Sequence, residues 1–384
     1  MRVAAVLEEG KLGGPQIYII RLAAAMHSNA KLGGFDTVII LPIENSSSTV
    51  SLCKSSDVEY KTIRISRITK ELRVALRYIF LFPFETWQLT KEFRRGDFQL
   101  VYIAGGAWQY KGAIAGKLAG KKVVWHLNDT GLPWIFRKLF GWIGRVADGF
   151  IYASERSKVY YNQLVDLNKP SYVIPSPVDT SFFDPKCVHS SDDVQIRKPG
   201  QEVIVGTVAN VSPVKGLDVL IRSAAKLKKQ GFDIQFVVIG AIYPSQQRYF
   251  ADLQKLAADL SLDNIEFVGA LDDVRPLMKQ FDIYLCSSNS ESSPISVWEA
   301  MAMEKPVVST DVGDVPIYVK EGESGFIVDV GDSDAMAERL SRLIKNPTIR
   351  HEFGGKAREI AVRELDISRC VERHLAAYQE ILSL

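Results

Sequence analysis

The sequence has few cysteines, no long apolar run and no low-complexity tract. Its four cysteines among 384 residues, at positions 53, 187, 286 and 370, are scattered and form no CxxC pair. This pattern suggests neither a disulfide framework nor a zinc site, and a reducing, cytoplasmic compartment fits it best. Apolar runs such as VVIGAIYP (237–244) are far shorter than a membrane span, so we expect a soluble globular protein.

The first residues, MRVAAVLEEG, are interpreted as a β-strand rather than a signal peptide, because Glu8 and Glu9 interrupt the apolar run. A length of 384 residues favours two domains over one. The net charge of +2 hides an asymmetry, since residues 1–180 carry 24 Lys and Arg against 15 Asp and Glu, and the remainder is acidic. The first half could therefore face an anionic partner.

Short β-branched runs alternate with amphipathic helical patterns along the chain, which predicts an α/β fold with two tandem doubly wound, Rossmann-like parallel sheets. The pattern stalls in a polar, turn-rich segment that we interpret as a linker at 184–201. The predicted domains are residues 1–183 and 202–365, and a last amphipathic helix at 366–384 is expected to pack back on the first domain. Ligands of such sheets bind at the carboxyl ends of strands, so we expect a site in a cleft between the domains.

The segment SSNSESSPISVWEAM (287–301) places two carboxylates around a loop that opens into a helix. Ser293 suits an N-cap and Pro294 suits the first helical turn, whose free N–H groups and dipole favour a phosphate. Glu291 precedes this turn, where it could accept hydrogen bonds from a sugar, and Glu299 could bind a vicinal diol such as a ribose. A capped helix carrying two solvated glutamates would show the same pattern.

Three further strand-end positions are candidates. Lys215, next to Gly216 at a helix start, is placed to hold a diphosphate, although a surface lysine would look the same. Gly13 and Gly14 would let the backbone approach a ligand closely, but they do not form a GxGxxG motif. His126 ends a strand and should look into the cleft, while a lone histidine is more often structural.

The stretch from Glu291 to Asp329, with its two glutamates eight positions apart, closely resembles the E-x7-E signature region of retaining glycosyltransferases of family 4. The resemblance extends to VANVSPVKGLDVLIRSAAKL (208–227) and, less densely, to LGGPQIYIIRLAAAM (12–26). It implies the GT-B fold, in which two Rossmann-like domains face a cleft and the C-terminal domain holds a nucleotide-sugar donor.

The resemblance also implies roles for single residues. Glu291 would contact the donor sugar, and Glu299 the ribose. Lys215 would hold the diphosphate, and His126 would lie near the sugar and the acceptor. The remaining implied donor contacts are Gly13 and Gly14 on the diphosphate, Ser292, Ser293, Pro294 and Ile295 on the distal phosphate and sugar, and Val268 to Leu271 at the base. Asn210 stands where the family often has an arginine, so Lys215, the helix dipole and Arg275 would carry more of the leaving-group charge.

No cofactor is expected, since the nucleotide sugar, with a UDP-hexose favoured, is a substrate. Asp332-Ser333-Asp334 matches a metal-binding DxD by letter but precedes a helix, so we interpret Asp332 as an N-cap and expect no metal. Amides and Lys215 could replace the cation. By resemblance the reaction retains the anomeric configuration. A GT-B nucleotide-sugar epimerase and a non-catalytic nucleotide-sugar-binding subunit remain alternatives.

The acceptor is predicted to be a glycan or a lipid-linked molecule of envelope polysaccharide or glycolipid synthesis, bound by the first domain. Residues 61–95 hold nine basic residues against three acidic ones, interleaved with aromatics, and residues 132–145 are aromatic-rich with three positive charges. Both segments could rest on an anionic membrane surface, so a peripheral cytoplasmic location is predicted. Core helices with a solvated basic face are the alternative. A nucleic-acid partner is not expected.

Overall fold

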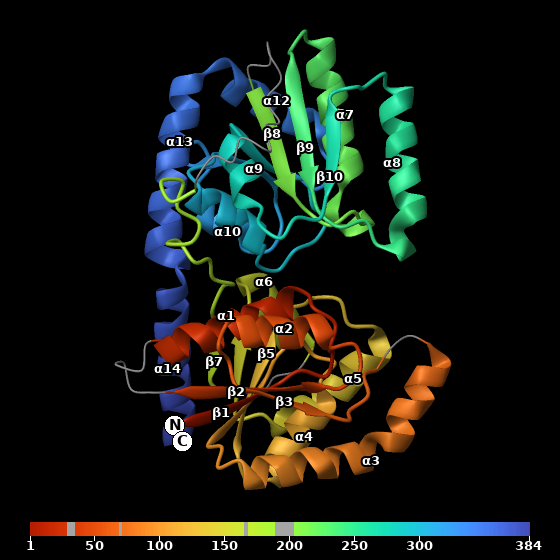
Figure 1. The fold of residues 1–384 in the computed structure, drawn as a ribbon, viewed down its shortest axis with the longest axis vertical. Coiled ribbons are helices and arrows are strands. Elements are labelled where there is room, and N and C mark those ends of the chain that lie inside the picture. The colour runs from red at the N-terminus through yellow and green to blue at the C-terminus, as the bar shows by residue number, and fades with distance from the viewer. Residues whose placement is uncertain (29–34, 69–70, 165–167, 189–202) are drawn as a thin grey trace. The chain divides into compact units, whose positions relative to one another are not determined.

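The computed structural model describes residues 1–28, 35–68, 71–164, 168–188 and 203–384, which form two compact units (Figure 1). Unit 1 comprises Met1–Ser176 and Ile367–Leu384, and unit 2 comprises Pro177–Asp366. The chain therefore enters unit 2 at residue 177, rather than after a linker at 184–201. Val178 and Phe183 explain the difference, because both are buried in the core of unit 2. Positions 189–201 of the predicted linker lie outside the described residues.

In its described part, unit 1 contains a seven-stranded sheet in the order β3-β2-β1-β4-β5-β6-β7, and every pairing is parallel. The strands are β1 (Arg2–Val6), β2 (Asp36–Pro42), β3 (Tyr60–Ile63), β4 (Leu100–Ile103), β5 (Lys122–Leu127), β6 (Gly149–Tyr152) and β7 (Ser171–Val173). The helices are α1 (Gly14–Ser28), α2 (Ser47–Ser55), α3 (Leu72–Arg95), α4 (Tyr110–Leu118), α5 (Trp134–Ile143), η2 (Gly144–Val146), α6 (Glu155–Leu164) and α14 (Ile367–Ser383).

Two apolar layers cover the faces of this sheet. Helices α1, α2 and α14 pack on one face, and α3, α4, α5 and α6 pack on the other, as Figure 1 shows for α1 and α2 against α3 and α4. The helix predicted at 366–384 is α14, which packs in unit 1 although unit 2 precedes it in the chain.

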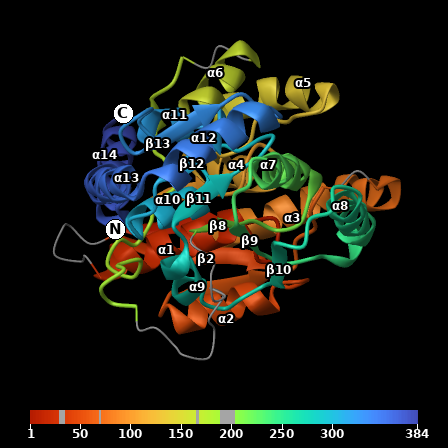
Figure 2. The ribbon, with the colours of Figure 1, turned by 90° about the horizontal axis from the view of Figure 1, so that it is seen from above.

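Unit 2 contains a six-stranded parallel sheet in the order β10-β9-β8-β11-β12-β13 within the described residues, and the strands follow one another across Figure 2. The strands are β8 (Val203–Val208), β9 (Ile234–Ile239), β10 (Ile265–Gly269), β11 (Ile283–Cys286), β12 (Val307–Thr310) and β13 (Gly325–Val328). The helices are η3 (Pro213–Lys215), α7 (Leu217–Lys229), η4 (Pro244–Gln246), α8 (Gln247–Asp259), α9 (Arg275–Gln280), α10 (Ile295–Ala302), α11 (Val315–Tyr318), α12 (Ser333–Lys345), α13 (Pro347–Ile360) and the π-helical η5 (Ala361–Leu365).

Both sheets are doubly wound, which confirms the predicted α/β class with two Rossmann-like domains. In each sheet the strand order reverses once near the centre, between β1 and β4 in unit 1 and between β8 and β11 in unit 2. The carboxyl ends at such a switch point are where ligands of this architecture bind. The fold therefore predicts a ligand site at two places, the switch point of each sheet.

Candidate functional site

The switch point of unit 2 brings together two of the predicted site residues. Lys215 lies in the loop after β8, and Glu291 lies in the loop after β11. The Lys215 Nζ and Glu291 Oε1 atoms are 2.6 Å apart, and the side chains are 26% and 15% exposed. Ser288 Oγ donates a hydrogen bond to the same Glu291 oxygen at 2.8 Å. A lysine and a carboxylate that are partly open to solvent can each exchange this partner for a ligand group.

The two loops are joined backbone to backbone. The Asn289 N–H donates to Val214 O at 2.7 Å, and its side-chain Nδ2 donates to Pro213 O at 2.8 Å. Gly216 has φ +57°, and a Cβ atom there would lie 2.1 Å from Ser287 O. Only glycine adopts this conformation without strain and leaves room for this approach. The position of Lys215 therefore depends on its glycine neighbour.

A third segment supports the Glu291 loop from behind. The Asp314 N–H donates to Ser292 O at 3.0 Å, and Thr310 Oγ1 donates to Ser288 O at 2.6 Å. Gly313 has φ +51°, and a Cβ atom there would lie 2.0 Å from Ser292 O. Our sequence reasoning did not identify Ser288, Thr310 or Gly313. The sequence feature that could have pointed to this contact is Gly313 itself, a glycine shortly after strand β12.

The helix after this loop, α10, begins at Ile295, one residue later than predicted. Its N-cap is Pro294, without a side-chain hydrogen bond, so the assignment of Ser293 as N-cap is wrong. Ser293 Oγ instead accepts a hydrogen bond from Trp298 Nε1 at 3.2 Å. The first-turn N–H groups of α10 still present the positive end of a helix dipole.

Neither Glu291 nor Glu299 extends freely into solvent. Glu299 lies within α10 and is only 8% exposed, and Glu291 is held by Lys215 and Ser288. The alternative of a capped helix with two solvated glutamates is therefore wrong. The ribose contact proposed for Glu299 stays a prediction.

The other predicted donor residues of unit 2 have other partners. Asn210 Oδ1 accepts from the Ala241 N–H at 3.0 Å, which links the loops after β8 and β9. Val268 and Leu271 are partly buried and pack against the apolar core. Arg275 pairs with Asp273 at 2.7 Å and lies 3.4 Å over the ring of Phe182, so its charge is already engaged.

Asp332 caps α12, as predicted, because its side chain accepts hydrogen bonds from the N–H groups of Asp334 and Ala335. In the described part of the chain, no group of three or more His, Cys, Asp or Glu residues is placed to hold a metal ion. The independence of the reaction from metal stays a prediction.

The residues predicted in unit 1, which are His126, Gly13 and Gly14, do not gather into a site as Lys215 and Glu291 do. His126 is 2% exposed and packs against Tyr18 and Tyr102, with ring centroids 4.9 and 5.8 Å away. It therefore lies in the core rather than facing open space, and its Nε2 has no hydrogen-bond partner among the described residues. Burial, together with His374, lowers the pKa of His126 to about 3. Gly13 and Gly14 lie at the start of α1, where a Cβ atom at Gly14 would meet nothing within 4 Å.

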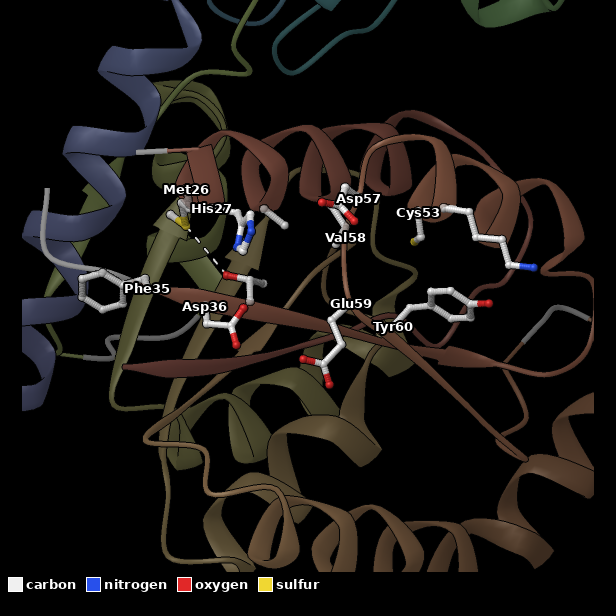
Figure 3. Close-up of a pocket in the computed structure, with 12 residues that line it drawn as sticks. Met26, His27, Phe35, Asp36, Cys53, Asp57, Val58, Glu59 and Tyr60 are labelled. Atoms are coloured by element: carbon white, nitrogen blue, oxygen red, sulfur yellow. Dashed lines mark hydrogen bonds between the residues drawn. The ribbon is translucent and has the colours of Figure 1, made fainter. Parts of the chain in front are cut away.

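A pocket that contains none of the predicted site residues lies near the amino ends of β2 and β3 (Figure 3). It has a volume of about 700 Å³ and is lined by residues that include His27, Asp36 and Glu59. His27 and Phe35 also line it, and the structure describes no residue from 29 to 34 between them. Since it lies at the opposite ends of the strands from the switch point, we assign it no role.

Comparison with known proteins gives two family models that together span most of the chain. "Glycosyltransferase Family 4" matches residues 12–182, and "Glycosyl transferases group 1" matches residues 189–360.

Among curated relatives, N-acetyl-alpha-D-glucosaminyl L-malate synthase of Bacillus anthracis is 25% identical over 58% of this chain and 57% of its own. The lipopolysaccharide core biosynthesis mannosyltransferase LpcC of Rhizobium leguminosarum is 28% identical over 62% of this chain and 64% of its own. The chain thus spans about three fifths of the length of these relatives. Anabaena Alr3699/HepE in complex with UDP-glucose superimposes with a TM-score of 0.82, at 20% identity, over 100% of both chains.

Proposed function

The chain belongs to the family 4 glycosyltransferases of GT-B fold, and from this premise we propose that it moves a hexose-type sugar from a nucleotide diphosphate to a hydroxyl group. The acceptor is a glycan or a lipid-linked molecule, and the anomeric configuration is retained. The observation that carries the proposal is the Lys215–Glu291 pair at the switch point of unit 2.

The pair explains how one site can serve both ends of the donor. When a nucleotide sugar enters, the Lys215 ammonium exchanges Glu291 for a phosphate oxygen, and the freed Glu291 carboxylate accepts hydrogen bonds from sugar hydroxyls. The N-terminus of α10 adds its dipole to the same anion. Because Asn210 stands where the family often has an arginine, Lys215 carries the largest share of the side-chain charge next to Glu291.

In the proposed reaction the bond between the anomeric carbon and the diphosphate oxygen breaks, and a bond to the acceptor oxygen forms on the same face. The acceptor proton passes to the leaving phosphate. Lys215 and the α10 amides stabilise the charge that develops on the diphosphate, as fixed donors do at other anionic transition states.

The comparisons support the identities of donor and acceptor. Alr3699/HepE is in complex with UDP-glucose, which favours a UDP-sugar. LpcC acts in lipopolysaccharide core biosynthesis, which favours a glycan or glycolipid acceptor.

The test is nucleotide release from a panel of UDP-, GDP- and ADP-sugars, measured with EDTA and without acceptor. We expect slow hydrolysis of one donor, which Lys215→Ala or Glu291→Ala abolishes and Asp332→Ala does not, since Asp332 only caps α12. Inhibition by EDTA would contradict metal independence.

The alternatives give different results. Calorimetric binding of one donor, without release even when a membrane extract supplies acceptors, would favour the non-catalytic subunit. A changed sugar without transfer would favour an epimerase. Product of inverted configuration by NMR would contradict retention.

We also propose that unit 1 rests on an anionic membrane surface. Helix α3 presents a stripe of exposed apolar side chains, of which Phe80 is 85% exposed, and α5 presents Trp134 and Trp142, the latter 80% exposed. Both helices pack on the same face of the sheet, through residues such as Phe93 and Phe140. The other members of the stripe are Leu76, Ile79, Phe84 and Trp87.

Basic residues accompany these aromatic side chains. Lys91 Nζ lies 5.1 Å from the Trp87 ring centre, and Lys138 Nζ lies 5.8 Å from that of Trp134. Such a combination suits the interface of an anionic bilayer. No helix among the described residues combines the length and apolarity needed to cross a bilayer.

Co-sedimentation with liposomes of anionic or neutral lipid tests the surface. We expect binding to anionic vesicles that Phe80→Ser and Trp142→Ser weaken. Val159→Ser, at an exposed apolar position on α6, should bind as the unmodified protein does. Equal binding by all three variants, or none by the unmodified protein, would remove the proposal.

A further inference from the structure

Lys215 and Glu291 keep bonding capacity in reserve while they pair with each other. One oxygen, Glu291 Oε1, accepts from both Lys215 Nζ at 2.6 Å and Ser288 Oγ at 2.8 Å. In the described part of the chain, Glu291 Oε2 and the remaining donors of the Lys215 ammonium have no hydrogen-bond partner. An ammonium offers three donors and a carboxylate about four acceptor sites, so both groups can also bind a ligand.

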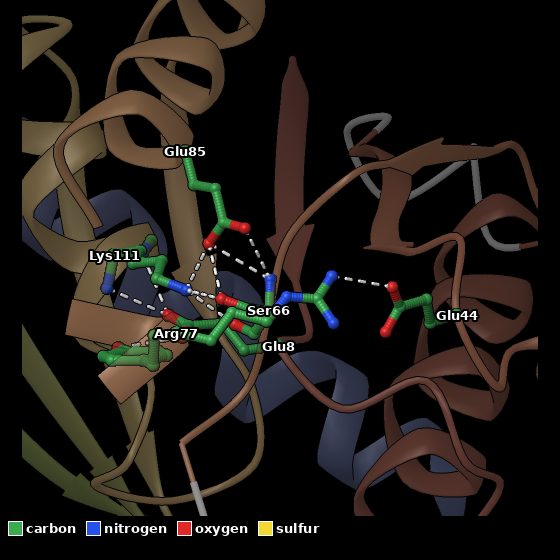
Figure 4. A network of polar contacts seen from close by, with 8 residues as sticks. Glu8, Glu44, Ser66, Arg77, Glu85 and Lys111 are labelled. Atoms are coloured by element: carbon green, nitrogen blue, oxygen red, sulfur yellow. Dashed lines mark hydrogen bonds and ion pairs between the residues drawn. The ribbon is translucent and has the colours of Figure 1, made fainter. Parts of the chain in front are cut away.

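The lysine–glutamate pair of unit 1 has already used this capacity (Figure 4). Lys111 Nζ lies 2.5 Å from Glu85 Oε2 and also donates to Ser66 O at 2.6 Å and to Ser66 Oγ at 2.9 Å. The Ser66 N–H donates to both Glu85 oxygens at 3.1 Å. This buried pair therefore holds the loop after β3, whereas the pair in unit 2 can exchange its partner for a ligand.

A nucleotide sugar satisfies both members of the unit 2 pair. In the proposed donor complex its diphosphate takes Lys215, and its sugar hydroxyls donate to Glu291. A free nucleoside diphosphate satisfies Lys215 alone. It leaves the Glu291 carboxylate without the lysine and beside a new negative charge, which is unfavourable because like charges repel.

Ser288 keeps Glu291 in place when Lys215 leaves it. Ser288 is 3% exposed, and its backbone oxygen accepts from Thr310 Oγ1 at 2.6 Å. Cys286 Sγ donates to Ser288 Oγ at 3.7 Å, so the hydroxyl proton is left to point at Glu291. The carboxylate therefore stays beside Lys215, where it competes with a phosphate for the ammonium.

We propose that Glu291 is an internal competitor for Lys215, and that this competition makes the site bind the intact nucleotide sugar in preference to the free nucleoside diphosphate. The proposal rests on the proposed function, since it assigns a preference to that donor site. In the reaction it favours release of the nucleotide once the sugar has been transferred. It also makes a claim that needs no sugar: any diphosphate must displace Glu291 to reach Lys215.

Calorimetry with UDP, GDP and ADP and with their sugars tests the preference. In Glu291→Gln the free nucleotide should bind about two- to fivefold more tightly, which is the size of the effect of a partly exposed ion pair. The preference for the nucleotide sugar, given by the ratio of the two Kd values, should fall about tenfold, because the sugar hydroxyls lose a charged acceptor. A residue that only supports the fold would weaken both ligands alike and leave the ratio unchanged.

Asp263→Asn is the matched control, because Asp263 also lies 2.6 Å from a lysine of unit 2, Lys228. It should leave the ratio unchanged. Weaker binding of the free nucleotide to Glu291→Gln, an unchanged ratio in that variant, or an equal change of the ratio in Asp263→Asn would each overturn the proposal.

Ser288→Ala provides a second variant in case Glu291→Gln fails to fold. Thr310 still holds the backbone, but Glu291 loses the hydrogen bond that fixes it. We therefore expect the nucleotide sugar to bind about tenfold more weakly, with a smaller effect on the free nucleotide. Ser223→Ala, which removes a buried hydroxyl that donates to Val219 O in α7, is the control. An equal effect of Ser288→Ala on both ligands would overturn the proposal.

Inorganic pyrophosphate, which has neither base nor sugar, separates this proposal from the proposed function. If no donor is hydrolysed, the transferase proposal fails. Tighter binding of pyrophosphate to Glu291→Gln than to the unmodified protein, without such a gain in Asp263→Asn, would still support the competition. If Glu291→Gln gains affinity neither for pyrophosphate nor for any free nucleotide, the competition is wrong.

Discussion

Each unit places a lysine–glutamate pair near its switch point, and the two pairs differ in burial. Lys215 and Glu291 of unit 2 are 2.6 Å apart with side chains 26% and 15% exposed. Lys111 and Glu85 of unit 1 are 2.5 Å apart with side chains 0% and 3% exposed. The two pairs therefore have nearly the same distance between lysine and glutamate, but one is partly exposed to water and the other is buried.

Burial decides what each pair can do. A partly exposed pair contributes about 0–1 kcal/mol and is easily exchanged, which suits groups that receive a ligand. Removal of one partner from a fully buried pair lowers the free energy of unfolding by several kcal/mol, because the other charge is left buried and unpaired. Such a pair suits groups that hold a loop in place. We therefore assign binding to the pair in unit 2 and positioning to the pair in unit 1.

Lys111→Ala gives the largest expected effect. It should lower the free energy of unfolding by about 3–5 kcal/mol, because Glu85 is left buried without its partner. Urea unfolding followed by circular dichroism measures the change. The double variant Lys111→Met/Glu85→Leu should recover most of the loss, and a single variant with unchanged stability would end the distinction between the pairs.

Lys215→Ala should have the opposite profile. We expect donor turnover to fall about 10²–10³-fold, as when one donor to a transition-state anion is removed, with unfolding changed by less than about 1 kcal/mol. The matched control is Lys228→Ala, which removes another 2.6 Å pair of unit 2, with Asp263, away from the site. Equal losses of activity in both variants would show that the effect comes from the loss of one positive charge anywhere in unit 2, not from the position of Lys215.

Gly313→Ala tests how far unit 2 relies on close backbone contacts. The new methyl group would lie 2.0 Å from Ser292 O, so we expect a loss of about 1–3 kcal/mol and a higher donor KM. Gly322→Ala is the control, because Gly322 also has a positive φ, +75°, but no atom within 4 Å of the added carbon. If thermal unfolding and donor KM change equally in both, the contact with Ser292 is irrelevant.

Acid should destabilise unit 1 through its buried histidines. Burial lowers the pKa of His126 to about 3 and that of His374 to about 4, below the ordinary 6.5. Their contribution is complete above pH 6.5 and is lost as pH falls below it, because the unfolded chain then binds more protons. Glu8 acts in the other direction between pH 4.5 and 7, since its pKa is raised.

A variant pair isolates one histidine from these opposing effects. The stability difference between the unmodified protein and His374→Gln should shrink by about 1 kcal/mol from pH 6.5 to 5.5. His351→Gln, at an exposed position of unit 2, is the control. A difference that stays constant with pH would show that His374 is not held neutral.

Much of the fold could be predicted because central parallel strands are continuous apolar runs. The segments before Glu8, Asn128 and Asn289 are of this kind, and each corresponds to a strand, β1, β5 and β11. The edge strands β3 (YKTI) and β7 (SYV) do not stand out in the sequence, because they are short and their side chains are largely polar or only partly buried.

The candidate site was predictable to the extent that its chemistry lies in single side chains. Lys215 and Glu291 stand out in the sequence, and the structure brings them together. The packing of His126 in the core and the contact of Gly313 with Ser292 depend on segments far apart in the chain. For the same reason Ser66, Glu85 and Lys111 form no recognisable motif, since they come from the loop after β3, from α3 and from the first turn of α4.

The position of α14 has a consequence for protein synthesis. Its residues Val371, Tyr378 and Ile381 belong to the core of unit 1, yet the ribosome makes them after all of unit 2. Unit 2 can close earlier, because its entry and exit are paired, with the Val178 N–H donating to Leu365 O at 2.9 Å. We therefore expect unit 2 to complete its core before unit 1 does, the reverse of the usual order in which the N-terminal domain folds first. Until α14 emerges from the ribosome, the apolar side chains of α1 that pack against it lack this part of their core.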